Sequence, residues 1–181
     1  MKKQLLIVAI LFFSISAVSA QSNSNQSFVI SAGVNLGLPA GDFHDGYSFG
    51  AGVELQGEYM FSDQFSGVGS VGYTEFFGKT ETATIGGQTF SAKAPNVGLI
   101  PILAGARFYP STNFFVGAKI GYGIFTNTGS SSGNSGFDYC PQIGYNADMF
   151  QLVLSYNSVS ITGETLSHLG LSLIFKLNSG K

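Results

Sequence analysis

The sequence has few charged residues and, beyond its N-terminus, no long apolar run. Only 10% of the 181 residues are charged, against about 25% in an average soluble domain. Hydrophobic residues nevertheless make up 44%, and the mean hydropathy is +0.26. After residue 20, no apolar run approaches the ~20 residues that a membrane-spanning helix needs. The composition therefore excludes a helical membrane protein and is not typical of a soluble enzyme domain.

Cysteine and tryptophan are almost missing as well. The single cysteine, Cys140, excludes a disulfide within the chain, so hydrogen bonds and packing must close the fold. Tryptophan is absent, which leaves Phe and Tyr as the only large aromatic residues. The formal net charge of −2 offers no basic surface for nucleic acid, and we expect no nucleic-acid partner.

The first twenty residues have the pattern of a secretory signal peptide. Lys2 and Lys3 form a basic start, the apolar stretch Leu5–Phe13 follows, and Val18-Ser19-Ala20 resembles a cleavage site. No cysteine follows the cut, so a lipoprotein is not indicated. We expect residues 1–20 to be removed and residues 21–181 to form one exported domain.

Apolar and polar residues alternate throughout that domain. In the clearest segment, Val116, Ala118 and Ile120 alternate with Gly117 and Lys119. This period of two predicts β-strands with one apolar and one polar face. The eight strands expected from it cover residues 28–38, 49–61, 66–80, 97–109, 114–124, 138–146, 151–160 and 169–177.

The expected connections alternate in length, which is typical of outer-membrane barrels. A lipocalin-like soluble barrel is the alternative, with apolar residues inside and polar residues outside. The apolar face recurs on almost every strand and leaves no polar exterior, whereas the other face is rich in glycine and holds nearly all strand charges. We therefore predict an all-β, eight-stranded, antiparallel, up-and-down transmembrane β-barrel in a bacterial outer membrane. The expected tight turns are 62–64, 110–113 and 148–150; the longer loops are 39–48, 81–96, 128–136 and 161–168.

Aromatic residues cluster where the expected strands end. Such rings favour the two membrane interfaces, so we predict one girdle at each rim of the barrel. The girdle beside the tight turns would contain Tyr59, Phe61, Phe65, Phe108, Tyr109, Phe114, Phe115 and Phe150; the other would contain Tyr47, Phe49, Phe76, Phe77, Phe125, Phe137 and Tyr139.

Three short stretches resemble a known family. Leu38–Phe43, Gly57–Phe61 and Ile100–Gly105 are similar to the small outer-membrane β-barrel family of Gram-negative bacteria, especially its porin-like Bacteroidota members. The resemblance covers the whole domain and implies an outer-membrane location and a barrel fold. It implies no common catalytic residue.

Six charged residues are expected to face the interior of the barrel. They balance as three acids and three bases: Glu54, Glu58, Arg107, Lys119, Asp148 and Lys176. Charges away from water persist only when they are paired, and an eight-stranded barrel is only wide enough for side chains to fill it. We therefore predict a salt-bridged plug in a protein with a structural or surface-interaction role. The alternative is a narrow porin-like channel for ions or small solutes.

Two histidines lie in expected loops that closure of the barrel would bring together. His44 lies in the first long loop and His168 in the last, with Asp42, Glu164 and Ser167 near them in sequence. A metal site or a lipid-modifying hydrolase would need a convergent geometry that loop tips seldom supply. We expect solvated histidines, no enzyme activity, no metal and no cofactor.

The longest connection contains Gly86-Gly87 between two β-prone runs. A glycine pair in this setting predicts a hairpin that extends strands three and four beyond the membrane. Its free edges could add a strand from an extracellular protein or another surface partner. Outer-membrane lipid is the other expected partner, and we expect a monomer.

Overall fold

The computed structural model describes residues 28–85, 88–126, 135–161 and 164–177. Within them, eight long antiparallel strands form the barrel, and a one-turn helix, α2 (Phe43–Gly46), follows the first strand. The expected signal peptide lies outside the described residues, so its cleavage stays a prediction. The barrel strands are β1 (Phe28–Ala40), β2 (Tyr47–Met60), β3 (Phe65–Gly78), β6 (Val97–Ser111), β7 (Phe114–Thr126), β8 (Ser135–Asn146), β9 (Phe150–Ile161) and β10 (Glu164–Lys176).

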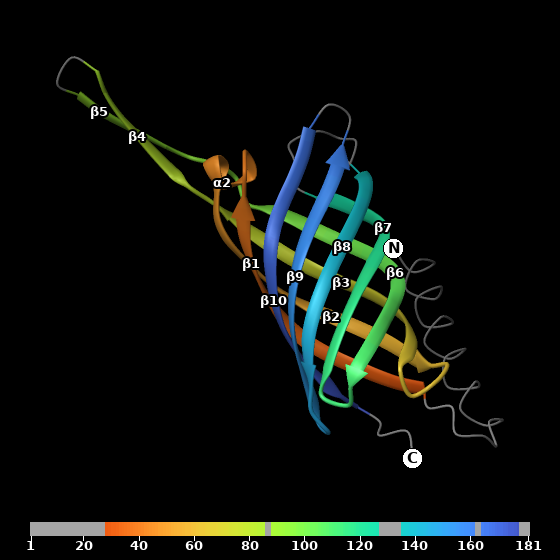
Figure 1. Cartoon of the computed structure of the whole chain (residues 1–181). Helices are drawn as coiled ribbons and strands as arrows, with labels where there is room; N and C mark the ends of the chain where they lie inside the picture. Colours follow the sequence, from red (N-terminus) through yellow and green to blue (C-terminus); the bar gives the residue numbers. More distant parts are fainter. Residues whose placement is uncertain (1–27, 86–87, 127–134, 162–163, 178–181) are drawn as a thin grey trace, which may run out of the picture.

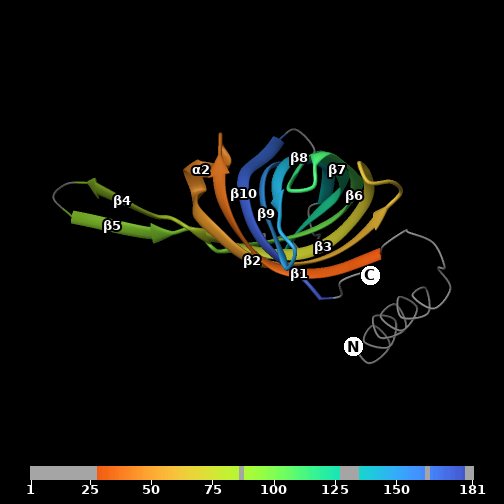
Figure 2. The ribbon, with the colours of Figure 1, turned by 60° about the horizontal axis from the view of Figure 1, so that its bottom comes forward.

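The sheet closes because its first and last strands pair. The register of β1 with β10 runs from Ser31 opposite Lys176 to Ala40 opposite Ser167. The strand order around the barrel is β1-β10-β9-β8-β7-β6-β3-β2, and β2 pairs with β1 (Figure 2). This arrangement confirms the predicted up-and-down barrel.

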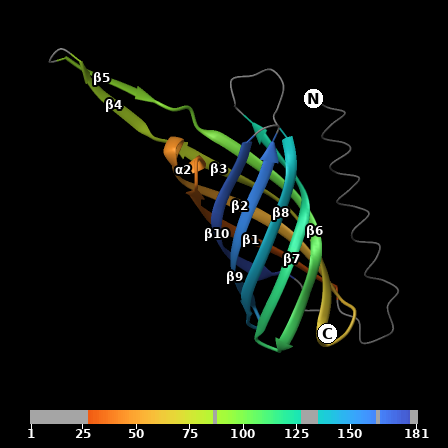
Figure 3. The same ribbon diagram turned by 45° about the horizontal axis from the view of Figure 1, so that its top comes forward.

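The two ends of the barrel differ. Strands β4 (Thr80–Ile85) and β5 (Gln88–Lys93) form a separate two-stranded sheet between β3 and β6. Figures 1 and 3 show this sheet running on beyond the end that carries α2, whereas the tight β6–β7 and β8–β9 turns lie at the opposite end. The expected hairpin is thus present, although its tip, Gly86 and Gly87, lies outside the described residues.

The two faces of the sheet follow the alternation in the sequence. Leu36 and Leu171 point outward and are 55% and 46% exposed, whereas Ser172, next to Leu171, is 7% exposed. The outer surface is therefore apolar and suited to lipid, as predicted. No helix among the described residues has the length and apolar character required to span a membrane.

Four of the aromatic residues expected in the girdles lie inside the barrel instead. Phe76 and Phe125 are buried in one apolar cluster, and Tyr109 and Phe115 in another. Their positions have the same parity as the lumen-facing residues of their strands, so the pleat turns them inward. Rings that do remain outside include Phe65 and others near the tight turns, some of which pack in pairs: Phe65 with Phe108, and Phe114 with Tyr145.

Candidate functional site in the barrel lumen

A charged layer crosses the lumen near the end with the tight turns. Arg107 on β6 forms an ion pair with Glu58 on β2, with 2.9 Å between Nη1 and Oε2. Arg107 is only 1% exposed, and the Glu58 carboxylate also accepts hydrogen bonds from the Ser66 and Tyr109 hydroxyls. The Gln151 amide on β9 also donates to it at 3.1 Å, so donors from β3, β6 and β9 surround the carboxylate.

The guanidinium extends this layer across the remaining width of the barrel. Its Nη2 donates to the side-chain oxygens of Gln56 at 2.8 Å and Gln142 at 3.3 Å, and its Nη1 donates to Gln151 at 3.1 Å. The guanidinium carbon also lies 4.2 Å from the centroid of the Phe115 ring. We call the set Glu58, Arg107, Gln56, Gln142 and Gln151 the Arg107 layer; its side chains come from β2, β6, β8 and β9 and fill the cross-section.

A second ion pair lies between the Arg107 layer and the end of the barrel that carries α2. The Lys119 ammonium on β7 donates to the Glu54 carboxylate on β2 at 2.9 Å and to the Ser70 hydroxyl, also at 2.9 Å. Four of the six charges expected inside therefore form two ion pairs across the barrel.

The other two expected lumen charges lie at its margin. Asp148 is exposed, because β8 ends at Asn146 and the alternation that would turn Asp148 inward does not continue through the turn. Lys176 is half-buried at the end of β10, and its ammonium donates to the carbonyl of Ala147 at 2.7 Å. Neither forms an ion pair with a described residue.

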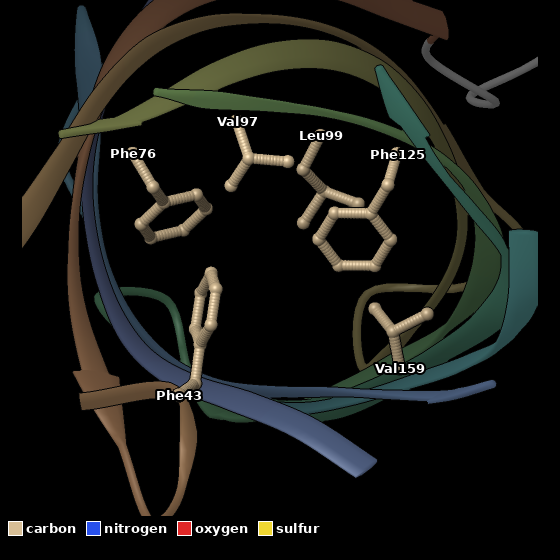
Figure 4. Packing of buried hydrophobic residues seen from close by; sticks show 6 residues of the cluster. All are labelled: Phe43, Phe76, Val97, Leu99, Phe125 and Val159. Atoms are coloured by element: carbon tan, nitrogen blue, oxygen red, sulfur yellow. The ribbon is translucent and has the colours of Figure 1, made fainter. Parts of the chain in front are cut away.

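An apolar cap closes the end of the barrel that carries α2. Phe43 on α2 is 3% exposed; its ring lies 4.8 Å from that of Phe76 and 6.4 Å from that of Phe125. Gly41, with φ of +60°, lets the chain turn into this helix. Figure 4 shows these side chains meeting across the lumen. The full cap comprises Phe43, Phe76, Val97, Leu99, Phe125 and Val159.

Between the Arg107 layer and the cap lies a cavity of about 40 Å³ lined by both polar and apolar residues. Glu54, Lys119 and Asp138 line it. Asp138 is fully buried, and neither carboxylate oxygen has a hydrogen-bond partner among the described residues. Our sequence-based assignment omits Asp138, although it lies on the polar face of its expected strand and its parity could have revealed it.

Only one of the two histidines is solvated, as was expected of both. His44 on α2 is exposed and lies beside the ammonium of Lys79. His168 belongs to β10, which begins at Glu164, and its buried ring packs against Phe76 with 5.0 Å between centroids. The described residues contain no group of three or more His, Cys, Asp or Glu side chains able to hold a metal ion.

A closed antiparallel barrel with an apolar exterior and a polar lumen defines the class of transmembrane β-barrels. The chain belongs to the family described as outer membrane protein beta-barrel domain, whose profile matches residues 7–175. It is therefore an outer-membrane β-barrel protein. In bacterial barrels of this class the short turns face the periplasm. A search of curated proteins gave no significant match.

Solved barrels of similar fold come from several bacteria. The chain resembles Ail of Yersinia pestis with a TM-score of 0.55 and 15% identity over 84% of this chain and 99% of that one. Neisserial surface protein A gives 0.52 and 16%, covering 85% and 100%. The N-terminal barrel domain of Pseudomonas aeruginosa OprF gives 0.51 and 15%, covering 84% and 98%. At such low identity these likenesses show the fold alone.

Proposed function

We propose that this protein is a plugged barrel with a structural or surface-interaction role, without enzyme activity. The observation that carries the proposal is the double closure of its lumen. The Arg107 layer fills the periplasmic half, and the Phe43 cap fills the outer mouth. An open channel would need both closures to move, and the Arg107 layer is held by a buried ion pair and several hydrogen bonds.

The ribbon formed by β4 and β5 supports the surface-interaction part of the proposal. The six residues of β4 pair with the six residues of β5, and neither strand pairs with a described strand of the barrel. An isolated two-stranded hairpin is marginally stable in water, and a strand at the edge of a sheet is a template for pairing with another chain. Such an edge is suited to an extended peptide segment that adds a third strand. Ail, which shares the fold, has been solved with the heparin analogue sucrose octasulfate.

Liposome swelling separates the plugged barrel from a small-solute channel. Proteoliposomes that contain the refolded protein should swell no faster in an iso-osmotic solution of a small neutral solute than protein-free liposomes do. Swelling at the rate of a matched porin control would favour the channel and contradict the plug.

A peptide selection tests the ribbon. Random peptides displayed on phage would be selected on the barrel in nanodiscs and counter-selected on a variant in which a short Gly-Ser turn replaces residues 80–93. We expect the enriched peptides to be extended, with alternating apolar residues, and to bind only the protein with the ribbon. Equal binding to both proteins would exclude the ribbon as the interaction site.

A further inference from the structure

The cavity in the lumen holds one carboxyl group more than its ion pair engages. Lys119 and Glu54 form an ion pair, and Asp138 adds a second carboxylate that is fully buried. Cys140 and His168 are the remaining titratable side chains among the described residues that line the cavity. The Ser158 backbone N–H and the Lys119 charge both lie close enough to act on the Asp138 carboxylate, although neither of its oxygens has a hydrogen-bond partner among the described residues. A lone ionised carboxylate away from water is very unfavourable unless something compensates its charge.

No described side chain forms a hydrogen bond or an ion pair with Asp138. Gly121 on β7 and Val159 on β9 are its cross-strand neighbours. Neither carries a polar side chain, and Val159 belongs to the cap above. Lys119 directs its ammonium to Glu54 and Ser70. Either a proton on Asp138 or a cation small enough to occupy the cavity can therefore compensate this charge.

Neutral oxygen atoms line the same cavity. The Asn157 amide nitrogen donates to Ser155 at 2.9 Å, so its oxygen remains an acceptor; Asn157 lies two residues from the cross-strand partner of Asp138. On the β1 side, the Asn35 oxygen accepts from Thr74 at 2.9 Å and has a second lone pair. Carboxylate, amide and hydroxyl oxygens are the ligands that hard cations prefer.

We propose that this cavity binds one small monovalent cation, such as Na⁺, K⁺ or NH₄⁺, held by Asp138 with neutral oxygens of the lumen. A monovalent cation matches the single negative charge of the Asp138 carboxylate. The described residues offer no cluster of three ligating acids or histidines for a divalent metal. The cavity of about 40 Å³ holds such an ion with little more than one or two waters. Because the cap and the Arg107 layer bound the cavity, the ion is a bound component of the lumen and is not conducted through the barrel.

Cation-dependent stability tests the proposal on the full-length mature protein in detergent. The unfolding midpoint would be compared in NaCl, KCl, NH₄Cl and N-methyl-D-glucamine chloride at equal ionic strength, the last cation being too large for the cavity. A ligand that binds only the folded state at ten times its Kd should raise the midpoint by roughly 3–6 °C. Asp138→Asn should abolish this difference, whereas Asp63→Asn, which removes an exposed turn charge, should preserve it.

Each contrary outcome identifies a different error. A wild-type midpoint that is equal in all four salts would mean that a proton alone neutralises Asp138, and the proposal fails. A cation effect that survives Asp138→Asn would place the ion elsewhere, which also overturns it.

A second measurement does not depend on any variant folding. Crystals of the wild-type protein grown with thallium(I) in place of sodium should show an anomalous scattering peak in the lumen beside Asp138. A well-ordered lumen without such a peak overturns the proposal. Neither measurement depends on conductance or on the ribbon, so its failure would leave the proposed function standing.

Discussion

Replacing Arg107 with alanine should destabilise the barrel more than any single exposed charge does. The change removes the ion pair to Glu58, three hydrogen bonds to glutamine side chains and the contact with the Phe115 ring. Breaking a buried ion pair by removing one partner costs about 3–5 kcal/mol. The Ser66 and Tyr109 hydroxyls still donate to the orphaned carboxylate, so we expect the lower figure, about 3 kcal/mol.

The assay is the temperature at which the folded form disappears on an SDS gel. For a chain of this length, a loss of 3 kcal/mol lowers the midpoint by roughly 6–12 °C. Asp63→Asn is a control for an exposed charge and should leave the midpoint unchanged. In a Glu58→Gln background, Arg107→Ala should cost less, because the acid it would orphan is gone. An unchanged midpoint in Arg107→Ala would refute the reasoning that this layer holds the lumen closed.

Three further predictions concern facing, packing and topology. Leu171→Arg should hinder folding into lipid vesicles by about 2–4 kcal/mol more than Ser172→Arg, and the reverse order would invert the assignment of faces. Gly144→Ala should lower the unfolding midpoint, equivalent to about 1–3 kcal/mol, because an added Cβ would lie 2.2 Å from a buried aromatic ring; an unchanged midpoint would show that this packing relaxes freely. An epitope inserted between residues 86 and 87 should be detected on intact cells, and one at Asn113 only after the outer membrane is opened; the opposite result would mean that the barrel is inverted.

The barrel itself could be predicted because every strand repeats one local rule. Alternation such as Val34 and Leu36 against Asn35 shows on each strand which side chains meet lipid. The same rule locates Glu58 and Arg107 in the lumen, although it cannot show that they meet, because they lie 49 residues apart in sequence. Their pairing depends on the strand order around the closed sheet.

Features that depend on where a strand ends were harder to predict. Asp148 follows the parity of β8 but lies beyond its last residue, and His168 lies on a strand rather than in the loop expected for it. Phe43 lies in an expected loop, and only its contacts with Phe76 and Phe125, distant in sequence, make it part of the cap. No local pattern encodes such a contact between a loop and the lumen.

The most direct test of the plugged lumen is single-channel conductance in planar bilayers. The wild-type protein would be compared with a double variant, Arg107→Ala with Phe43→Ala, which removes the centre of each closure. We predict that the wild type shows no steady conductance and that the double variant, reconstituted in equal amount, opens in discrete steps. A wild-type protein that conducts as readily as the double variant would contradict the account.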